Sequence, residues 1–214
     1  MLSLAKRIAS RLRRPPASRP EPKRQQGAAE IARAREQLAS QSKLHLGCGS
    51  NVLPGWANLD LEGPSPVIQW DLTQPIPAAS DSFDYVYSEH FIEHIGLDEA
   101  RALVRECQRL LKPGGTLRLS TPNLEKLVDE YRSGRLSEWD DMRWKPQTSC
   151  QLLNEGMRLW GHQFVYDLPE LLALLRASGF SHIERMEWRK STHDALRNIE
   201  TRPYHDELII EARK

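Results

Sequence analysis

The chain has 214 residues, of which 39% are hydrophobic and 28% are charged, and its formal net charge is +1; this length suits one α/β domain with a sizeable core and excludes two large ones. Its three cysteines have no paired spacing, which argues against a disulfide framework and a cysteine zinc site, and no apolar run approaches the roughly 20 residues of a membrane-spanning helix. Arginines stand where a secretory signal needs its apolar core, so the sequence predicts a cytoplasmic protein.

The N-terminal segment 1–27 is basic and rich in proline. Between Met1 and Arg24 eight basic residues stand against one acidic residue, which gives +7 there and leaves −6 for the remainder of the chain. The proline-rich run 15–22 cannot sustain a helix. Within 1–14, by contrast, apolar residues recur every four positions. Three interpretations remain open: a disordered basic tail, a short amphipathic helix in weak peripheral contact with an anionic membrane, and a cleaved organellar transit segment.

Residues 28–214 are predicted to form the domain, which begins with a helix over Ala28–Ser40. Alternating and β-branched patterns then predict four strands, at Lys43–Leu46, Ala57–Leu61, Val67–Trp70 and Phe83–Tyr87. A long helix follows, with Asp98 as its expected N-cap, and the turn residues Lys112–Gly115 end it.

The second half continues the alternation of strands and helices. A fifth strand is predicted over Thr116–Ser120, and a helix over Leu168–Ser178 closes at Gly179. Residues 123–165 look irregular, so we expect an insertion over the open end of the sheet. Two last strands are expected to pair with each other, Ile183–Arg189 and Glu207–Ala212. This order predicts an α/β fold with a mainly parallel sheet and helices on both faces.

Three of the predicted strands end in residues that suit an adenosine ligand. The first ends at the loop 47–49, where glycines let the backbone approach a ligand closely. The second ends in Asp60, whose carboxylate can accept hydrogen bonds from both ribose hydroxyls, and the third ends in Asp71. Each acid taken alone is also explained by a turn or helix-cap role. The dinucleotide fingerprint GxGxxG fails at Val52, which argues against a nicotinamide-dependent oxidoreductase.

The segment from Leu44 to Asn123 resembles the core of small class I S-adenosylmethionine (SAM)-dependent methyltransferases, in the methyltransferase-type-11-like branch. The matching pieces are LHLGCGSN, NLD, WDL, SDSFDYVYSEHFIEHI and ECQRLLKPGGTLRLSTPN. The resemblance implies SAM as cofactor and a Rossmann-like seven-stranded, mainly parallel sheet whose last strand is antiparallel. Many relatives of this kind belong to surface-polysaccharide pathways.

The resemblance also implies which residues contact the cofactor. The glycine loop would lie against the methionine part, the second strand end against the ribose, the third against the adenine, and the fourth under the sulfonium. The expected cofactor-binding residues are Gly47, Cys48, Gly49, Asn51, Asp60, Leu61, Asp71, Leu72, Ser88 and Glu89. Three features depart from the family: His45 replaces an acid, Asn51 replaces a third glycine, and the helix between the first two strands is compressed into 50–56.

Four residues are candidates for catalysis: His90, Glu93, His94 and His162. In a helical turn the first three share one face. A hydroxyl acceptor needs a base, and histidine is the usual one. Three interpretations remain open. Glu93 and His94 are structural, or His90 or His162 is a general base, or the group holds a divalent cation, as a comparable segment with a later histidine does in a few related methyltransferases. The site predicted from the sequence contains no metal.

The acceptor site is less clearly marked in the sequence. Residues 197–206 form either a border of the acceptor pocket or a solvated loop. Four aromatic residues either line that pocket or pack the insertion: Trp139, Trp144, Trp160 and Tyr166.

The function predicted from the sequence is methyl transfer from SAM to a small-molecule or glycan acceptor, on oxygen. The alternatives are a catalytically inactive SAM-binding module and a nucleic-acid or protein methyltransferase. Basic residues outside the N-terminal segment are scattered among acids, so no nucleic-acid partner is expected. The sequence leaves the oligomeric state open.

Overall fold

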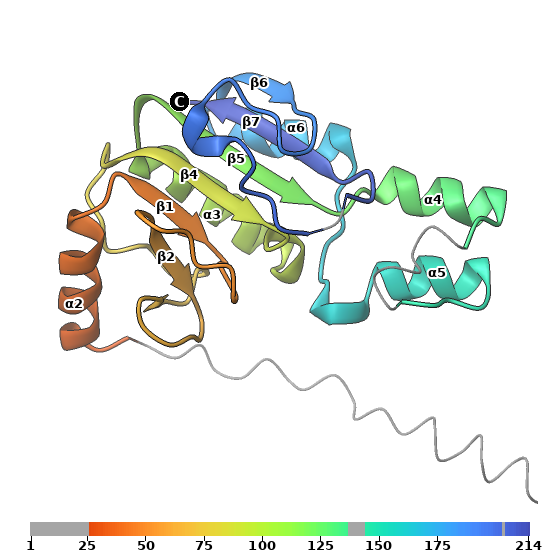
Figure 1. Ribbon diagram of the computed structural model, residues 1–214, viewed down its shortest axis with the longest axis horizontal. Coiled ribbons are helices and arrows are strands. Elements are labelled where there is room, and N and C mark those ends of the chain that lie inside the picture. Colours follow the sequence, from red (N-terminus) through yellow and green to blue (C-terminus); the bar gives the residue numbers. More distant parts are fainter. Residues whose placement is uncertain (1–25, 137–143, 203) are drawn as a thin grey trace, which may run out of the picture.

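The computed structural model describes residues 26–136, 144–202 and 204–214 (Figure 1). The predictions for the N-terminal segment, including membrane contact through residues 1–14, therefore lie outside the described residues, apart from Gln26 and Gly27. Among the described residues, no helix combines the length and the apolar character needed to cross a bilayer.

Seven strands form one sheet in the order β3-β2-β1-β4-β5-β7-β6. Their bounds are β1 Lys43–Leu46, β2 Ala57–Asp60, β3 Ile68–Gln69, β4 Phe83–Glu89, β5 Leu111–Thr121, β6 Ser181–Arg185 and β7 Leu208–Arg213. The neighbours from β3 to β5 pair in parallel, and β7 pairs antiparallel with both β5 and β6. The predicted sheet, with its last strand antiparallel, is confirmed.

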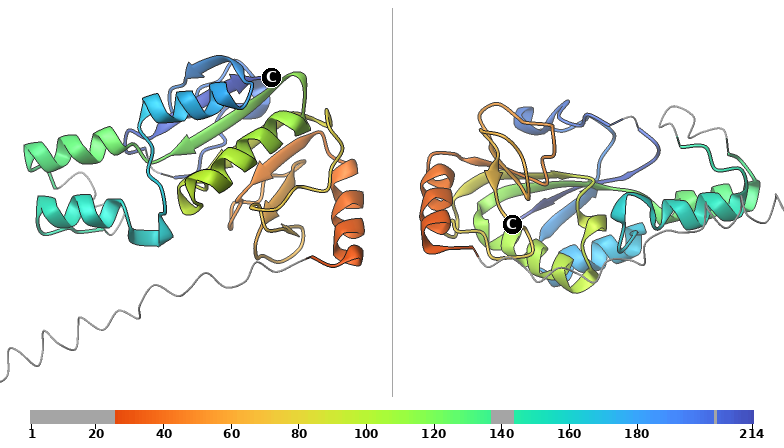
Figure 2. Two further views of the ribbon diagram at one scale, coloured as in Figure 1. Left: turned by 180° about the vertical axis from the view of Figure 1, so that it is seen from behind. Right: turned by 90° about the horizontal axis from the view of Figure 1, so that it is seen from below.

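The three longest helices next to the sheet share one hydrophobic core with it. They are α2 (Ala28–Ala39), α3 (Leu97–Leu110) and α6 (Leu168–Ala177). Helices α3 and α6 lie behind the sheet in Figure 1 and in front of it in the left view of Figure 2. Leu44 and Leu46 of β1 point into this core because side chains alternate along a strand.

The opposite face of the sheet carries much less helix. Its hydrophobic cluster contains Trp56, Tyr87 and Leu196, of which Leu196 belongs to the short 3-10 helix η4 (Asp194–Leu196). The connection between β6 and β7, residues 186–207, passes over this face (Figure 1). Helices thus lie on both faces, but within the described residues the second face has only this single turn.

The segment 123–165 is the part where the predicted local structure was wrong. It contains two helices, α4 (Leu124–Ser133) and α5 (Ser149–Gly156), which pack side by side beyond the edge of the sheet (Figure 1). Side-chain oxygens of Asn123 and Thr148 accept hydrogen bonds from the first turns, each at 3.1 Å. A separate hydrophobic cluster, which includes Leu127 and Leu152, joins the two helices.

The start of α3 also differs from the prediction. The helix begins at Leu97, and Gly96 rather than Asp98 is its N-cap. The Gly96 N–H donates to Oε2 of Glu99 at 3.1 Å, which is the bond that the third helical residue makes in a capping box. The Asp98 side chain instead pairs with Arg101 at 2.9 Å.

Candidate active site

The tips of β1, β2 and β3 are joined by hydrogen bonds. The N–H of Cys48 donates to the carbonyl of Leu59 at 3.1 Å, and the N–H of Trp70 donates to the carbonyl of Asp60 at 2.7 Å. The N–H of Gly49 donates to Oδ2 of Asp60 at 2.8 Å. The glycine loop and the acid of the second strand therefore form one unit, as the sequence predicts for a shared site.

The two glycines of this loop have different surroundings. Both have positive φ, +65° at Gly47 and +51° at Gly49. A Cβ atom at Gly47 would lie 2.5 Å from the ring of Phe91, whereas a Cβ atom at Gly49 would meet no atom within 4 Å. Gly47 is thus required by packing, and the backbone at Gly49 is open to a ligand.

The residues expected around the ribose and adenine lie in three different environments. Leu61, next to Asp60, is 66% exposed and offers an apolar surface. Oδ1 of Asp71 accepts hydrogen bonds from the N–H and the hydroxyl of Thr73, at 2.9 and 2.7 Å, so this acid has the turn role that the sequence left open. Leu72 is buried in the main core, which leaves little of its side chain for a ligand.

His45, which the sequence marked as a departure from the family it resembles, holds the compressed connection 50–56. Its Nδ1 lies 3.1 Å from Oδ1 of Asn58, which also accepts from the N–H of Leu53 at 2.9 Å. The Asn58 amide donates to the carbonyls of Leu53 and Trp56, at 3.0 and 2.9 Å. Burial lowers the pKa of His45 to about 4, so the ring is neutral and its Nδ1 carries the proton. Nothing in the sequence pointed to Asn58.

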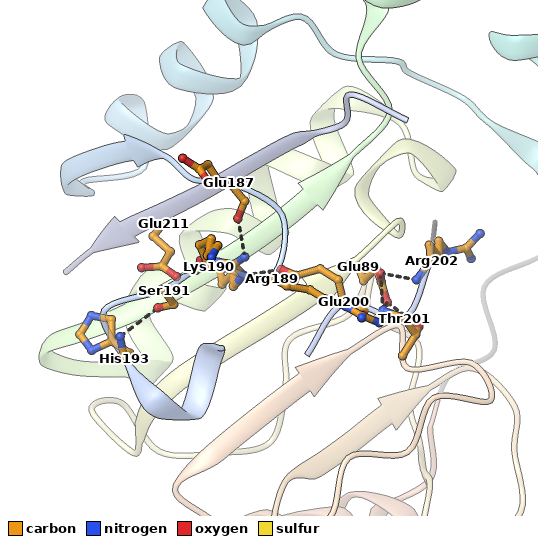
Figure 3. A network of polar contacts seen from close by, with 11 residues as sticks. Glu89, Glu187, Arg189, Lys190, Ser191, His193, Glu200, Thr201, Arg202 and Glu211 are labelled. Carbon is orange, nitrogen blue, oxygen red and sulfur yellow. Dashed lines mark hydrogen bonds and ion pairs between the residues drawn. The ribbon is translucent and has the colours of Figure 1, made fainter. Parts of the chain in front are cut away.

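The two cofactor candidates at the end of β4 are both buried. Glu89 accepts hydrogen bonds from the N–H and hydroxyl of Thr201 and from the N–H of Arg202, at 2.9–3.1 Å (Figure 3). The hydroxyl of Ser88 is buried without a hydrogen-bond partner. Glu89 therefore fastens the connection 186–207 to the end of β4, a role that its sequence context did not suggest.

Arg118 of β5 fastens the same connection from beneath. Its guanidinium is fully buried and donates to the carboxylates of Glu200 and Glu211, at 2.5 and 2.6 Å. It also donates to the carbonyl of Lys190 at 2.9 Å. Figure 3 shows these acidic and backbone partners gathered over the sheet. An arginine inside a strand gave no sign of this role in the sequence.

A pocket of about 310 Å³ lies at the carboxyl ends of β4 and β5. Its walls come from the turn after β4, from α4 and α5, and from the end of the connection 186–207. The lining residues are His90, Glu93, His94, Pro122, Asn123, Lys126, Leu127, Trp144, Gly156, Trp160, His162, Arg202, His205 and Glu207. The pocket thus brings together all four predicted catalytic residues, while the predicted cofactor residues lie outside it.

The aromatic residues of the insertion divide between this pocket and the core. Trp144 and Trp160 line the pocket and meet edge to face, with ring centroids 5.3 Å apart. Tyr166 is buried in the main core and does not line the pocket. Trp139 lies outside the described residues.

His90 lies between two carboxylates. Its Nδ1 is 3.3 Å from Oε1 of Glu93, and its Nε2 is 3.7 Å from Oε1 of Glu207. Burial alone would lower the pKa of His90, but the two facing carboxylates of Glu207 and Glu93 outweigh it and raise the pKa to about 9. A ring that is protonated at neutral pH cannot accept a proton, so this geometry speaks against His90 as the general base.

His162 and Glu93, unlike His90, are both deprotonated. Burial lowers the pKa of His162, and its Nδ1 lies 2.9 Å from the carbonyl of Gly156, so Nδ1 donates and the lone pair of Nε2 is left over. Burial by itself would raise the pKa of Glu93, but the facing His90 ring has the larger effect. The pKa of Glu93 is therefore lowered, and the carboxylate is ionised. The ring of His94 lies 5.0 Å from that of His162, measured between centroids.

Comparisons with known proteins point to one fold. Residues 54–119 match the family model described as "Methyltransferase domain", and no curated protein matches the chain. A solved SAM-dependent methyltransferase from Mesorhizobium loti is 22% identical, with 88% of this chain and 99% of that chain covered and a TM-score of 0.49.

Two further solved structures reach a TM-score of 0.50. One, from Thermotoga maritima, is described as a SAM-dependent methyltransferase and possible histamine N-methyltransferase; it is 16% identical over 86% of this chain and 91% of that chain. The other, the YcgJ protein from Bacillus subtilis, is 14% identical over 88% and 99%. These two share the fold of the present chain.

Proposed function

We propose that this chain is a SAM-dependent methyltransferase whose cofactor lies on the joined tips of β1, β2 and β3. The hydrogen bond from Gly49 to Asp60 is the observation that carries the proposal, because it couples an open glycine backbone to a strand-end carboxylate. The match to a methyltransferase domain over residues 54–119, which includes both Asp60 and Asp71, supports the same assignment.

The residues present fit the chemistry of an adenosyl group. One oxygen of Asp60 accepts the Gly49 N–H, and the carboxylate has lone pairs left for ribose hydroxyls. The exposed side chain of Leu61 provides an apolar surface beside that carboxylate. Bound SAM supplies an activated methyl group, so the protein mainly has to hold the acceptor in line with that group.

The pocket at the ends of β4 and β5 receives the acceptor, which we infer to be a small-molecule or glycan hydroxyl. A volume of about 310 Å³ is at the lower end of ligand pockets and suits a small group rather than a long chain. Trp160 is 52% exposed and presents a ring on which a sugar can stack. The histidines and carboxylates of the pocket provide partners for a hydroxyl.

Calorimetry with SAM, S-adenosylhomocysteine and NAD tests the cofactor assignment. We expect the first two to bind and NAD not to bind. Asp60→Ala should weaken SAM binding by roughly 1–3 kcal/mol, about five- to 150-fold. Asp98→Ala is the matched control, since the Asp98 side chain is 94% exposed on α3. Unchanged affinity in Asp60→Ala, with the fold verified by circular dichroism, would refute the assignment.

Turnover separates an enzyme from an inactive SAM-binding module. Incubation of the protein with cell extract and isotope-labelled SAM should produce a labelled compound heavier by one CH₂ group, detected by mass spectrometry. SAM binding without any labelled product in extracts from several sources would favour the inactive module.

A further inference from the structure

We propose that Glu93, His94 and His162 bind one divalent transition-metal ion at the wall of the pocket. Each residue offers one ligand atom, and these atoms lie within 4.8 Å of one another. We call these three residues the Glu93 cluster. Ion binding by the cluster does not depend on methyl transfer, so it is tested without an activity assay.

Glu93 supplies the first independent observation. Its side chain is fully buried, and its Oε2 accepts a hydrogen bond from the Thr121 hydroxyl at 3.1 Å. Its Oε1 has no hydrogen-bond partner of good geometry, although it lies 3.3 Å from Nδ1 of His90 and 3.8 Å from Nε2 of His94. A cation at the cluster would give this buried oxygen a direct bond, which neither histidine ring provides.

His162 has the bonding pattern of a metal ligand. Metal-binding histidines usually donate the N–H of the second ring nitrogen to a carbonyl or carboxylate, which fixes the tautomer. Nδ1 of His162 is 2.9 Å from the carbonyl of Gly156. This bond leaves the lone pair of Nε2 free of that carbonyl and available to an ion.

The backbone holds the two halves of the cluster in register. The N–H groups of Gln163 and Phe164 donate to the carbonyl of Glu93, at 2.7 and 3.2 Å. The side-chain amide of Gln163 donates to the carbonyl of His94 at 2.7 Å. Segments 69 residues apart in the chain are thus tied together directly beside the three ligands, which keeps these ligands close to one another without an ion.

The donor set selects the kind of ion. Two imidazoles and one carboxylate suit Zn²⁺, Co²⁺, Fe²⁺ or Mn²⁺, whereas Ca²⁺ and Mg²⁺ prefer oxygen ligands. Tetrahedral bonds of about 2.1 Å place ligand atoms about 3.4 Å apart, so the rings have to close by about an ångström. The His94 side chain is 30% exposed and has room to turn.

The ion would also activate an acceptor hydroxyl in the pocket. Only this consequence rests on the proposed function. Three protein ligands leave a coordination position for water or for the acceptor oxygen. An ion held there would lower the pKa of an acceptor hydroxyl and so make its oxygen a better nucleophile toward the methyl group of SAM.

Titration of the metal-free full-length protein with Zn²⁺ and with Co²⁺ tests the inference. We expect one ion per chain by calorimetry and, for Co²⁺, a visible absorption band typical of low coordination number. His162→Ala and His94→Ala should each weaken binding on the order of 100-fold. His193→Ala is the matched control, because His193 contacts Tyr85 and Thr116 on the other face of the sheet.

The outcomes separate the two proposals. Absence of Co²⁺ absorption, or equal ion affinity in His94→Ala, His162→Ala and His193→Ala, would overturn the metal site. The His94→Ala variant guards against a folding defect, because the His94 side chain is 30% exposed and its loss should leave the far-ultraviolet circular dichroism unchanged. SAM titrated into the same samples reports on the proposed function alone, because the cofactor residues lie outside the Glu93 cluster.

Discussion

His45 shows how one residue changes the electrostatics of the glycine loop. Its neutral ring bonds to Asn58 beneath the connection 50–56. The sequence singled out His45 but not this bond, since the partner of His45 lies 13 residues away on the next strand. A buried neutral histidine makes stability depend on pH.

Acid should destabilise the protein through His45. Burial holds its folded pKa at about 4, against an ordinary value of 6.5. Between these values the unfolded chain takes up a proton that the folded chain does not, so this contribution is fully present above about pH 6.5 and falls as the pH decreases toward 4. The loss at pH 5 should be about 2 kcal/mol.

Urea unfolding near pH 7 and pH 5 measures this effect. His45→Gln, which cannot be protonated, should be less stable overall but should lose about 2 kcal/mol less between the two pH values than the wild type. Equal losses in the two proteins would assign the acid sensitivity to other groups.

Gly47 and Gly49 should respond differently to alanine. Gly47→Ala places a methyl group 2.5 Å from the Phe91 ring, so we expect a loss of stability of about 2–4 kcal/mol. Gly49→Ala meets open space and should cost only about 1–2 kcal/mol, from its φ of +51°.

The informative readout is SAM affinity in the folded Gly49→Ala variant. If the open backbone at Gly49 faces the cofactor, the added methyl group should weaken binding at least about tenfold. Thermal unfolding and calorimetry on the same preparations separate the two effects. Wild-type SAM affinity in Gly49→Ala would place the cofactor elsewhere.

At the scale of elements, periodic patterns predicted the strands well, because alternation between core and solvent is local information. The irregular appearance of 123–165 was misleading: α4 and α5 are short, and their apolar residues become a core only when the two helices pair. The connection 186–207 shows the same limit. Its course over the sheet depends on Glu89 and Arg118, whose partners are far away in the chain.

Arg118 should be a major determinant of how this connection is held. Arg118→Met removes the cation shared by Glu200 and Glu211 and leaves two buried carboxylates unpaired, which should cost about 3–5 kcal/mol. The triple variant Arg118→Met, Glu200→Gln, Glu211→Gln removes the charges together and should recover much of that loss. Urea unfolding of both variants checks this, and a triple variant less stable than the single one would contradict it.

At the scale of the whole molecule, the sheet brings the proposed cofactor residues and the pocket residues to the same side, where the carboxyl ends of its parallel strands lie. Parallel strands β1 to β5 all end there, so a sequence reading could place Gly49, Asp60 and the turn after β4 together. The sequence did not show that the tips of β1, β2 and β3 lie outside the pocket. It also did not show that Arg202 and Glu207 line that pocket. Those positions are set by tertiary contacts that leave no local pattern.

A crystal structure of the protein with S-adenosylhomocysteine tests the central claim most directly. The account predicts ribose hydroxyls on the Asp60 carboxylate, the ligand backbone against Gly49, and the sulfur facing the pocket that His90 and Glu93 line. Ligand density away from the tips of β1, β2 and β3, with no ligand atom on the Asp60 carboxylate, would contradict it.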